Sequence, residues 1–285
     1  MFPKDRGYPM ANGYSQVHPS CAQVGRNMDV ICVWADSSWP TDDKWPRKRW
    51  VTLVELRFEC VARIMNLLTG DLVKDDFRIN KTNAAYNDKT INGKLVKGGC
   101  HTPVIQKLSS TNGFMIVWSA FNQDGDLQGI FGRIWDQDFV GEEKEFQINT
   151  THYYDQRDPD ICELSGRKRY AIVWQSYRQN DVWSWDVVAT IRDRQGDELV
   201  PEFTVNVYRP YDQHSPKAVC LFNKDRLLPS KVVFIYVSRD DNKSEGIRAR
   251  VASESLQFYG NEWIINSGII GEQTKPSAAV LVNGQ

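Results

Sequence analysis

The sequence predicts an all-β fold, a β-propeller-like array of four antiparallel four-stranded blades, from three observations. Aromatic residues make up 12% of the 285 residues, with 10 tryptophans against 5 methionines, and rings and β-branched residues favour sheet. A proline preceded by glutamine recurs along the chain, and a fixed motif closes each copy. Short apolar runs separated by turn residues fill each copy. Equal copies of four short strands are typical of propeller blades.

Each copy begins at a proline with glutamine three residues before it, and the pairs are Gln16/Pro19, Gln156/Pro159, Gln213/Pro216 and Gln273/Pro276. Pro103 continues the series with Cys100 in place of glutamine, so the prolines are 84, 56, 57 and 60 residues apart. This spacing predicts one repeat array rather than the two separate domains that the chain length alone suggests.

Four strands are expected in each copy. The first follows the proline, and the second ends on a tryptophan or, in the fourth copy, on Tyr236. The second strands are apolar throughout, which indicates that both of their faces are covered. The third carries an arginine, with Thr190 or Arg192 at that place in the third copy, and the fourth ends at asparagine. These landmarks are Trp34, Trp118 and Trp174; Arg63, Arg133 and Arg250; and Asn80, Asn149, Asn206 and Asn266.

The landmark tryptophans and Trp135 are expected in the core, and each arginine is expected to hold its own blade. The predicted parts are an N-terminal extension, a first blade with insertions, three more blades, and one further strand or overhang, at 1–15, 16–100, 101–155, 156–212, 213–272 and 273–285. A two-sheet sandwich is the competing all-β fold, but that fold would not require copies of such similar sequence and spacing. Because an open array exposes a sheet edge, we expect a larger or shared propeller that assembles with other chains or further blades. The alternative is a closed four-bladed ring.

Charge and hydropathy limit the classes of partner that this chain is expected to bind. Thirty-five Lys and Arg residues nearly balance 36 Asp and Glu residues, which argues against binding of nucleic acid. The longest apolar runs, such as 232–237, are far shorter than the ~20 residues that span a bilayer, so no membrane insertion is expected. A protein or a glycan remains as the expected partner.

Cysteines and glycosylation sequons point to different compartments. The six cysteines form no CxxC pair and no zinc spacing, so we expect buried free thiols. No apolar signal-peptide core is visible in the first twenty residues, so we expect either that the protein is not secreted or that this chain starts inside a longer gene product. Sequons at Asn80, Asn149 and Asn242 would be glycan acceptors in a secreted protein, although the repeat itself accounts for the first two.

The second copy, GFMIVWSAFNQDGDLQGIFGRIWDQDFVGEEKEFQINTT, together with the Gln-x-x-Pro starts, resembles the tandem repeat of large bacterial RTX-type surface adhesins. The resemblance extends from Gln16 onward and is strongest in copies two and three. It departs where 36–60 and 81–100 add length, and in the presence of cysteines. It implies a non-catalytic structural or binding module, within a larger assembly at a cell surface. An intracellular propeller scaffold is the alternative.

No catalytic constellation is visible. The sequence lacks a GxSxG elbow, a Gly-rich phosphate loop, an HExxH motif and the Asp box of sialidase-type propellers. His18, His101 and His214 each precede a repeat proline, so the repeat explains them without a metal site. The segment 124–126 is expected to be a turn rather than part of a calcium loop. We therefore predict no enzyme activity and no cofactor, with a glycosidase that uses two carboxylates from separate blades as the less favoured alternative.

Tryptophans outside the repeat register mark a candidate binding face. In an up-and-down blade, the turn between strands two and three and the connection to the next blade emerge on the same side. The additions at 36–50, 81–100 and 177–186 all fall there. Rings beside guanidinium groups suit stacking on sugars and pairing with acidic groups, and loop packing is the alternative. The predicted binding residues are Trp39, Trp45, Trp50, Arg47, Lys48, Arg49, Trp183, Trp185 and Arg178.

Overall fold

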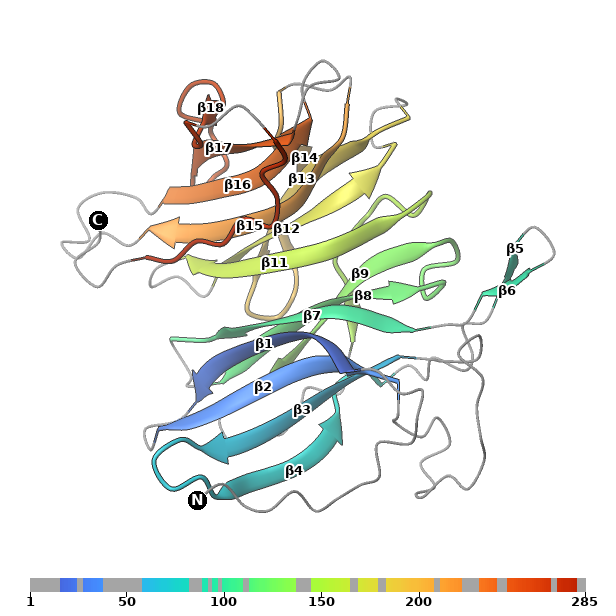
Figure 1. Cartoon of the computed structure of the whole chain (residues 1–285), viewed down its shortest axis with the longest axis vertical. Helices are drawn as coiled ribbons and strands as arrows, with labels where there is room; N and C mark the ends of the chain where they lie inside the picture. The colour runs from blue at the N-terminus through green and yellow to red at the C-terminus, as the bar shows by residue number, and fades with distance from the viewer. Residues whose placement is uncertain are drawn as a thin grey trace. The chain divides into compact units, whose positions relative to one another are not determined.

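The structure is a computed structural model that describes residues 16–24, 28–37, 58–81, 89–91, 94–96, 99–109, 113–136, 145–164, 169–178, 183–207, 211–221, 231–239, 245–267 and 271–280. Within these residues the chain is all β, with four antiparallel four-stranded sheets and no helix (Figure 1). The predicted propeller-like fold class is confirmed.

Strands that follow one another in the sequence build each sheet, and we call the sheets blades one to four. Blade one contains β1 (Gln16–Val24), β2 (Asp29–Asp36), β3 (Glu59–Asn66) and β4 (Leu72–Arg78). Blade two contains β7 (Cys100–Lys107), β8 (Phe114–Phe121), β9 (Gln128–Trp135) and β10 (Phe146–Gln147). Between them in sequence is a hairpin of β5 (Lys89–Ile91) and β6 (Lys94–Val96).

The second half of the chain repeats this order. Blade three contains β11 (Gln156–Leu164), β12 (Arg169–Tyr177), β13 (Trp185–Asp193) and β14 (Glu198–Thr204). Blade four contains β15 (Gln213–Leu221), β16 (Lys231–Arg239), β17 (Glu245–Ser253) and β18 (Trp263–Ile264).

The chain divides into two compact units. Unit 1 covers Met1–Lys107 and Thr111–Gln147 and holds blades one and two, whereas unit 2 covers Leu108–Ser110 and Ile148–Gln285 and holds blades three and four. In each unit, buried apolar side chains of the two blades form one core. Ile31, Ile64 and Trp118 belong to the core of unit 1, and Val173 and Phe234 to that of unit 2.

The repeat proline lies at a bulge in the first strand of each blade. The strand register shifts there in all four blades. The residue before the proline has a positive φ between 46° and 56° each time, at His18, Thr102, Asp158 and Ser215. Positive φ is uncommon for residues other than glycine, so the recurring spacing records a bulge that redirects the strand.

The asparagine that closes one copy binds the glutamine that opens the next. The Nδ2 to Oε1 distances are 3.3, 3.0 and 3.3 Å for Asn149–Gln156, Asn206–Gln213 and Asn266–Gln273. Asn80 and Asn149, the first two sequons, are 4% and 2% exposed, so the folded protein presents neither for glycosylation. Asn242 lies outside the described residues.

The expectation of free thiols was wrong, because all six cysteines pair. Cys21–Cys32 joins β1 to β2 within blade one, Cys60–Cys100 joins blade one to blade two, and Cys162–Cys220 joins blade three to blade four. The partners of the last two bonds are 40 and 58 residues apart in sequence. Folding brings together strands of neighbouring blades, which sequence spacing does not reveal.

Three of the four tryptophans expected in the core are buried, namely Trp118, Trp135 and Trp174. Trp34 is only partly buried, and its Nε1 donates to Asp36 Oδ2 at 3.1 Å. It lies on the face of blade one opposite the core of unit 1, where a hollow begins. No helix among the described residues is long and apolar enough to cross a membrane.

Candidate functional site

Three of the nine predicted binding residues lie together in blade three. Arg178, Trp183 and Trp185 form, with Tyr154 and Tyr177, a group that we call the aromatic cluster. The other six predicted residues lie outside the described residues: Trp39, Trp45, Trp50, Arg47, Lys48 and Arg49.

Arg178 holds the exposed part of the aromatic cluster. Its guanidinium carbon lies 3.9 Å from the ring centre of Trp183 and 4.5 Å from that of Tyr154, and its Nη1 donates to the Tyr154 hydroxyl at 2.6 Å. Trp183 is 73% exposed. The indole is therefore positioned by a cation–π contact while much of its surface stays open to a ligand.

Pairing of β12 with β13 builds the inner part of the cluster. Tyr177 is opposite Trp185 in the register, and their ring centres are 5.2 Å apart. The Arg157 guanidinium carbon lies 4.4 Å from the Trp185 ring, and Arg157 also forms an ion pair with Asp155. The aromatic cluster therefore continues into charged side chains at the start of β11.

The bulges of unit 2 carry polar side chains that could take part in chemistry. Asp158 on β11 and Ser215 on β15 occupy equivalent positions before the repeat proline, and these two strands contact each other. Ser215 N donates to Gln175 Oε1 at 2.8 Å, two residues before Tyr177 of the aromatic cluster. Asp158 directly follows Arg157. The bulge of β15 is therefore linked to the aromatic cluster by a hydrogen bond to β12, and the bulge of β11 is linked to it by the neighbouring residue Arg157.

His214 links the bulge of blade four to a carboxylate. Its Nδ1 lies 3.0 Å from Ser215 Oγ, and its Nε2 lies 3.0 Å from Glu245 Oε1. The side chains of His214 and Glu245 are 24% and 21% exposed, so solvent and ligands can reach this pair. An N–H at Nε2 of His214 would donate to Glu245 Oε1 and fix the orientation of this carboxylate.

Sequence reasoning missed Asp158, Ser215 and Glu245. The available signal was that the two residues between glutamine and proline differ from copy to copy, while the landmarks around them do not. Interpreting His214 only as part of the repeat register overlooked its contact with Glu245, which comes from a strand 31 residues away in sequence.

A second carboxyl on β11, that of Asp160, binds β15, the first strand of the next blade. Its Oδ2 accepts from Ala218 N at 2.9 Å, and its Oδ1 lies 3.7 Å from Lys217 Nζ. Burial raises the pKa of this carboxyl, although Lys217 and the backbone bonds oppose the rise. In blade one, Ser20 accepts in the same way from Ile105 N, at 3.4 Å, so this contact belongs to the repeat.

Metal-ligating groups do not gather in the described part of the chain. No cluster of three or more His, Cys, Asp or Glu side chains there is arranged to hold an ion. The segment 124–126 forms a turn in which Gly125 has a φ of 103° and Asp126 N donates to Asp124 Oδ1 at 3.4 Å. This geometry agrees with the turn that the sequence predicts there.

Comparison with known proteins identifies the fold. No protein-family model and no curated protein matches the chain. Among solved structures, an α-L-arabinofuranosidase from Fusarium graminearum, in complex with an iminosugar inhibitor, is similar with a TM-score of 0.51 at 12% identity, over 86% of this chain and 64% of that one. A thermostable family-43 glycoside hydrolase reaches 0.47 at 10% identity, over 94% and 77%. At such identities the first likeness shows the fold.

These findings contradict the predictions of a non-catalytic module and of no enzyme activity. Both predictions rested on the adhesin-like repeat and on missing sequence motifs. Missing motifs do not exclude a glycosidase, because its carboxylates can be single residues on separate strands. Many of the similar solved structures are glycoside hydrolases, among them the arabinofuranosidase, and none is an RTX-type adhesin. The chain thus has a β-propeller fold that is similar to that of an arabinofuranosidase, and the prediction of a non-catalytic module is withdrawn.

Proposed function

We propose that this protein hydrolyses glycosidic bonds, at a site in unit 2 formed by the aromatic cluster with Asp158 and Glu245. The observation that carries the proposal is an exposed tryptophan, held by an arginine, in the same unit as two partly exposed carboxylates. Asp158 lies on the first strand of blade three, and Glu245 begins the third strand of blade four. The fold shared with an arabinofuranosidase supports the reaction class.

The aromatic cluster would bind the sugar. An exposed indole face offers apolar contact to the C–H face of a pyranose or furanose ring, and Trp183 presents such a face. Arg178 and Tyr154 supply hydrogen-bond donors for sugar hydroxyls. Of the predicted binding residues, Arg178, Trp183 and Trp185 enter this proposal.

Asp158 and Glu245 would provide the chemistry. Glycoside hydrolysis needs one carboxylic acid to protonate the leaving oxygen and one carboxylate to act as base or nucleophile. Asp158 comes from blade three and Glu245 from blade four, so the fold supplies the two groups independently. The His214 contact would position Glu245 without itself touching the substrate.

The test is turnover by the purified full chain on chromogenic arabinofuranosides, galactosides and soluble arabinan. We expect Asp158→Asn and Glu245→Gln each to lower kcat by about 10²- to 10⁴-fold, because each removes a proton donor or acceptor. Trp183→Ala should raise KM on arabinan by about tenfold, a loss of about 1.4 kcal/mol of binding, with a smaller change in kcat.

The matched control is Asp197→Asn, which removes an exposed carboxylate in the turn between β13 and β14 and should leave turnover unchanged. Circular dichroism and melting of every variant separate loss of chemistry from loss of fold. No turnover of any glycoside by the folded chain would contradict the proposal. Full activity in both carboxylate variants would instead remove these residues from it.

We also infer an oxidising compartment, at a cell surface or outside the cell. The three disulfides support this placement, since such bonds are rare in a reducing cytosol. Thiol labelling of the protein isolated from its source should modify six cysteines only after reduction. Six labelled cysteines without reduction would favour the intracellular alternative.

A further inference from the structure

Consecutive copies are joined by one recurring contact, which we call the blade joint. The arginine of the third strand donates to the carbonyl oxygen of the residue before the asparagine that closes the preceding copy. The bonds are Arg133 Nη1 to Ile79 O at 2.9 Å, Arg250 Nη1 to Val205 O at 2.6 Å, and Arg192 Nη2 to Ile148 O. Arg192 also forms an ion pair with Glu198 of its own blade, as expected, whereas the bonds of Arg133 and Arg250 to these carbonyls reach the preceding blade rather than their own.

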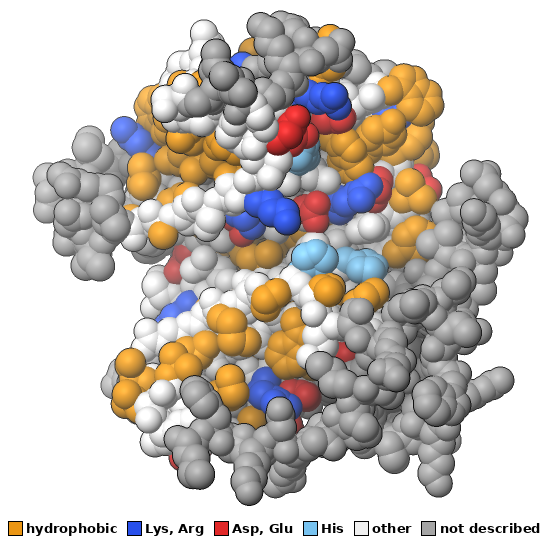
Figure 2. Space-filling view, in the orientation of Figure 1, with side chains coloured by type: hydrophobic (Ala, Val, Ile, Leu, Met, Phe, Trp, Pro, Cys, Tyr) orange, Lys and Arg blue, Asp and Glu red, His pale blue; other side chains and the backbone are white. Residues whose placement is uncertain are grey.

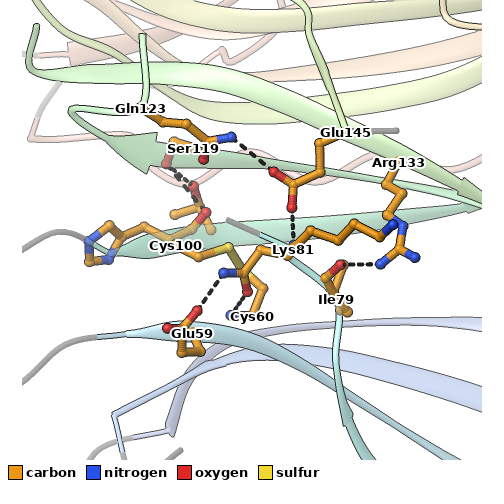
Figure 3. The surroundings of a disulfide bond; sticks show 12 residues. Glu59, Cys60, Ile79, Lys81, Cys100, Ser119, Gln123, Arg133 and Glu145 are labelled. Carbon is orange, nitrogen blue, oxygen red and sulfur yellow. Dashed lines mark hydrogen bonds between the residues drawn. A yellow bond between two sulfur atoms is a disulfide. The ribbon is translucent and has the colours of Figure 1, made fainter. Parts of the chain in front are cut away.

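Apolar side chains fill the joint of unit 1. The Phe77 ring centre lies 5.4 Å from that of Trp135, and the Arg133 guanidinium carbon lies 4.3 Å from the Trp135 ring. Ile79, which supplies the carbonyl, is fully buried. Figure 3 shows Arg133 directed at the Ile79 oxygen, close to the Cys60–Cys100 disulfide. The joint thus combines one charged hydrogen bond with an aromatic contact.

The joint of unit 2 repeats this chemistry. Phe203 takes the place of Phe77, and its ring centre lies 5.6 Å from that of Phe258. The Arg250 guanidinium carbon lies 3.5 Å from the Phe258 ring, and Val205 is fully buried. Both of these joints therefore have two halves. One half is an arginine beside an aromatic ring, and the other is an aromatic-x-aliphatic segment of the preceding copy.

Blade one exposes an arginine half. Arg63 is the equivalent arginine, and it forms a two-bonded ion pair with Asp76, with Nε–Oδ1 at 2.6 Å and Nη2–Oδ2 at 2.9 Å. Beside it is a hollow of about 350 Å³, whose lining includes Val17, Pro19, Trp34, Arg63, Met65 and Asp76. Figure 2 shows apolar side chains gathered over β1 and β2. This face has the composition of a joint whose aromatic-x-aliphatic segment is missing.

Blade four exposes the other half. Trp263, Ile264 and Ile265 are 45%, 56% and 50% exposed, whereas Ile79, the equivalent of Ile265 in blade one, is fully buried. The segment is nevertheless folded, because Ile247 N donates to the Asn266 side chain at 2.7 Å, as Cys60 N does to Asn80. A formed aromatic-x-aliphatic segment is thus presented to solvent.

We propose that these two halves bind each other between two copies of the chain. The hollow of blade one in one copy receives Trp263 and Ile265 of a second copy, and Arg63 donates to the Ile265 carbonyl oxygen. The surfaces are complementary because one is an apolar hollow with a guanidinium and the other an apolar ridge with a carbonyl acceptor. Since the two surfaces differ, the contact is heterologous and generates a ring or a filament.

Sedimentation velocity of the full chain over a range of concentrations tests the proposal. Wild type should form oligomers larger than dimers as the concentration rises. Arg63→Glu removes the arginine half, and Ile265→Glu removes the aliphatic half, so each variant alone should stay monomeric. An equimolar mixture of the two should form dimers and nothing larger, because it contains one intact pair of halves and two blocked ends.

Leu199→Glu is the matched control, since Leu199 is an exposed apolar residue on β14, the fourth strand of blade three. It should assemble like wild type. If Arg63→Glu fails to fold, Met65→Glu blocks the same hollow. Wild type that stays monomeric throughout, single variants that assemble as wild type does, or a mixture that forms no dimer would each overturn the proposal. None of these outcomes bears on glycosidase activity, which is measured separately.

Discussion

Strands β2 and β8 occupy the same place in blades one and two, but they differ in burial. β8 is buried at all eight of its residues, whereas in β2 Ile31 and Val33 are buried and Cys32 and Trp34 are only partly so. Both strands are apolar and end their run on tryptophan. An apolar run therefore indicates that a strand can be covered on two faces, while its surroundings decide whether the second face is covered.

The two strands should differ most in how much stability the protein loses when their tryptophans are replaced. Trp118→Ala should lower the free energy of unfolding by about 3–5 kcal/mol, because it leaves a cavity in the core of unit 1. Trp34→Ala should cost about 1–2 kcal/mol, since less of its surface is removed from water. Urea titration followed by circular dichroism measures both, and equal losses would show that Trp34 is as much a core residue as Trp118.

This comparison also shows how far sequence reasoning reaches. The spacing of prolines, tryptophans and asparagines was sufficient for the blades, because several landmarks make contacts that recur, such as the Asn–Gln bond of Asn149, Asn206 and Asn266. It was insufficient for Cys162–Cys220 and for Arg250 to Val205, which depend on how one blade lies against the next. The candidate carboxylates were missed because they are not repeated: the position of Asp158 is occupied by His18, Thr102 and Ser215 in the other copies.

A smaller difference is expected between the arginines of the two blades. Arg133→Met should lower the free energy of unfolding by about 1.5–3 kcal/mol, since it removes a charged hydrogen bond to the buried carbonyl of Ile79. Arg63→Met should cost about 0–1 kcal/mol, because the Arg63–Asp76 pair is about one-third exposed, at 37% and 30%. The same urea titration measures both losses. A larger loss for Arg63→Met would contradict the view that the bond to the buried carbonyl stabilises the protein more than the partly exposed ion pair.

The smallest effect is a pH dependence at the hollow of blade one. Burial raises the pKa of Asp76 above its ordinary value of 3.8, and the bond from Arg63 only partly offsets the rise. The protonated carboxyl is thus favoured in the folded state, so its contribution to stability is full below about pH 3.8 and is lost as pH rises through the folded-state pKa. The stability of wild type relative to Asp76→Asn should fall as pH increases from 3 to 7. A difference that grows with pH would show that the ion pair outweighs burial.

The disulfides between blades have a mechanical consequence. A repeat array pulled from its ends usually extends copy by copy, but Cys60–Cys100 and Cys162–Cys220 each fasten two neighbouring blades. These bonds enclose loops whose ends are 40 and 58 residues apart in sequence. At about 3.5 Å per residue, about 340 Å of chain in these loops cannot extend under force while the bonds are intact. A reductant would break the two disulfides and free these loops. The length to which the chain can be stretched therefore depends on the redox state of its surroundings.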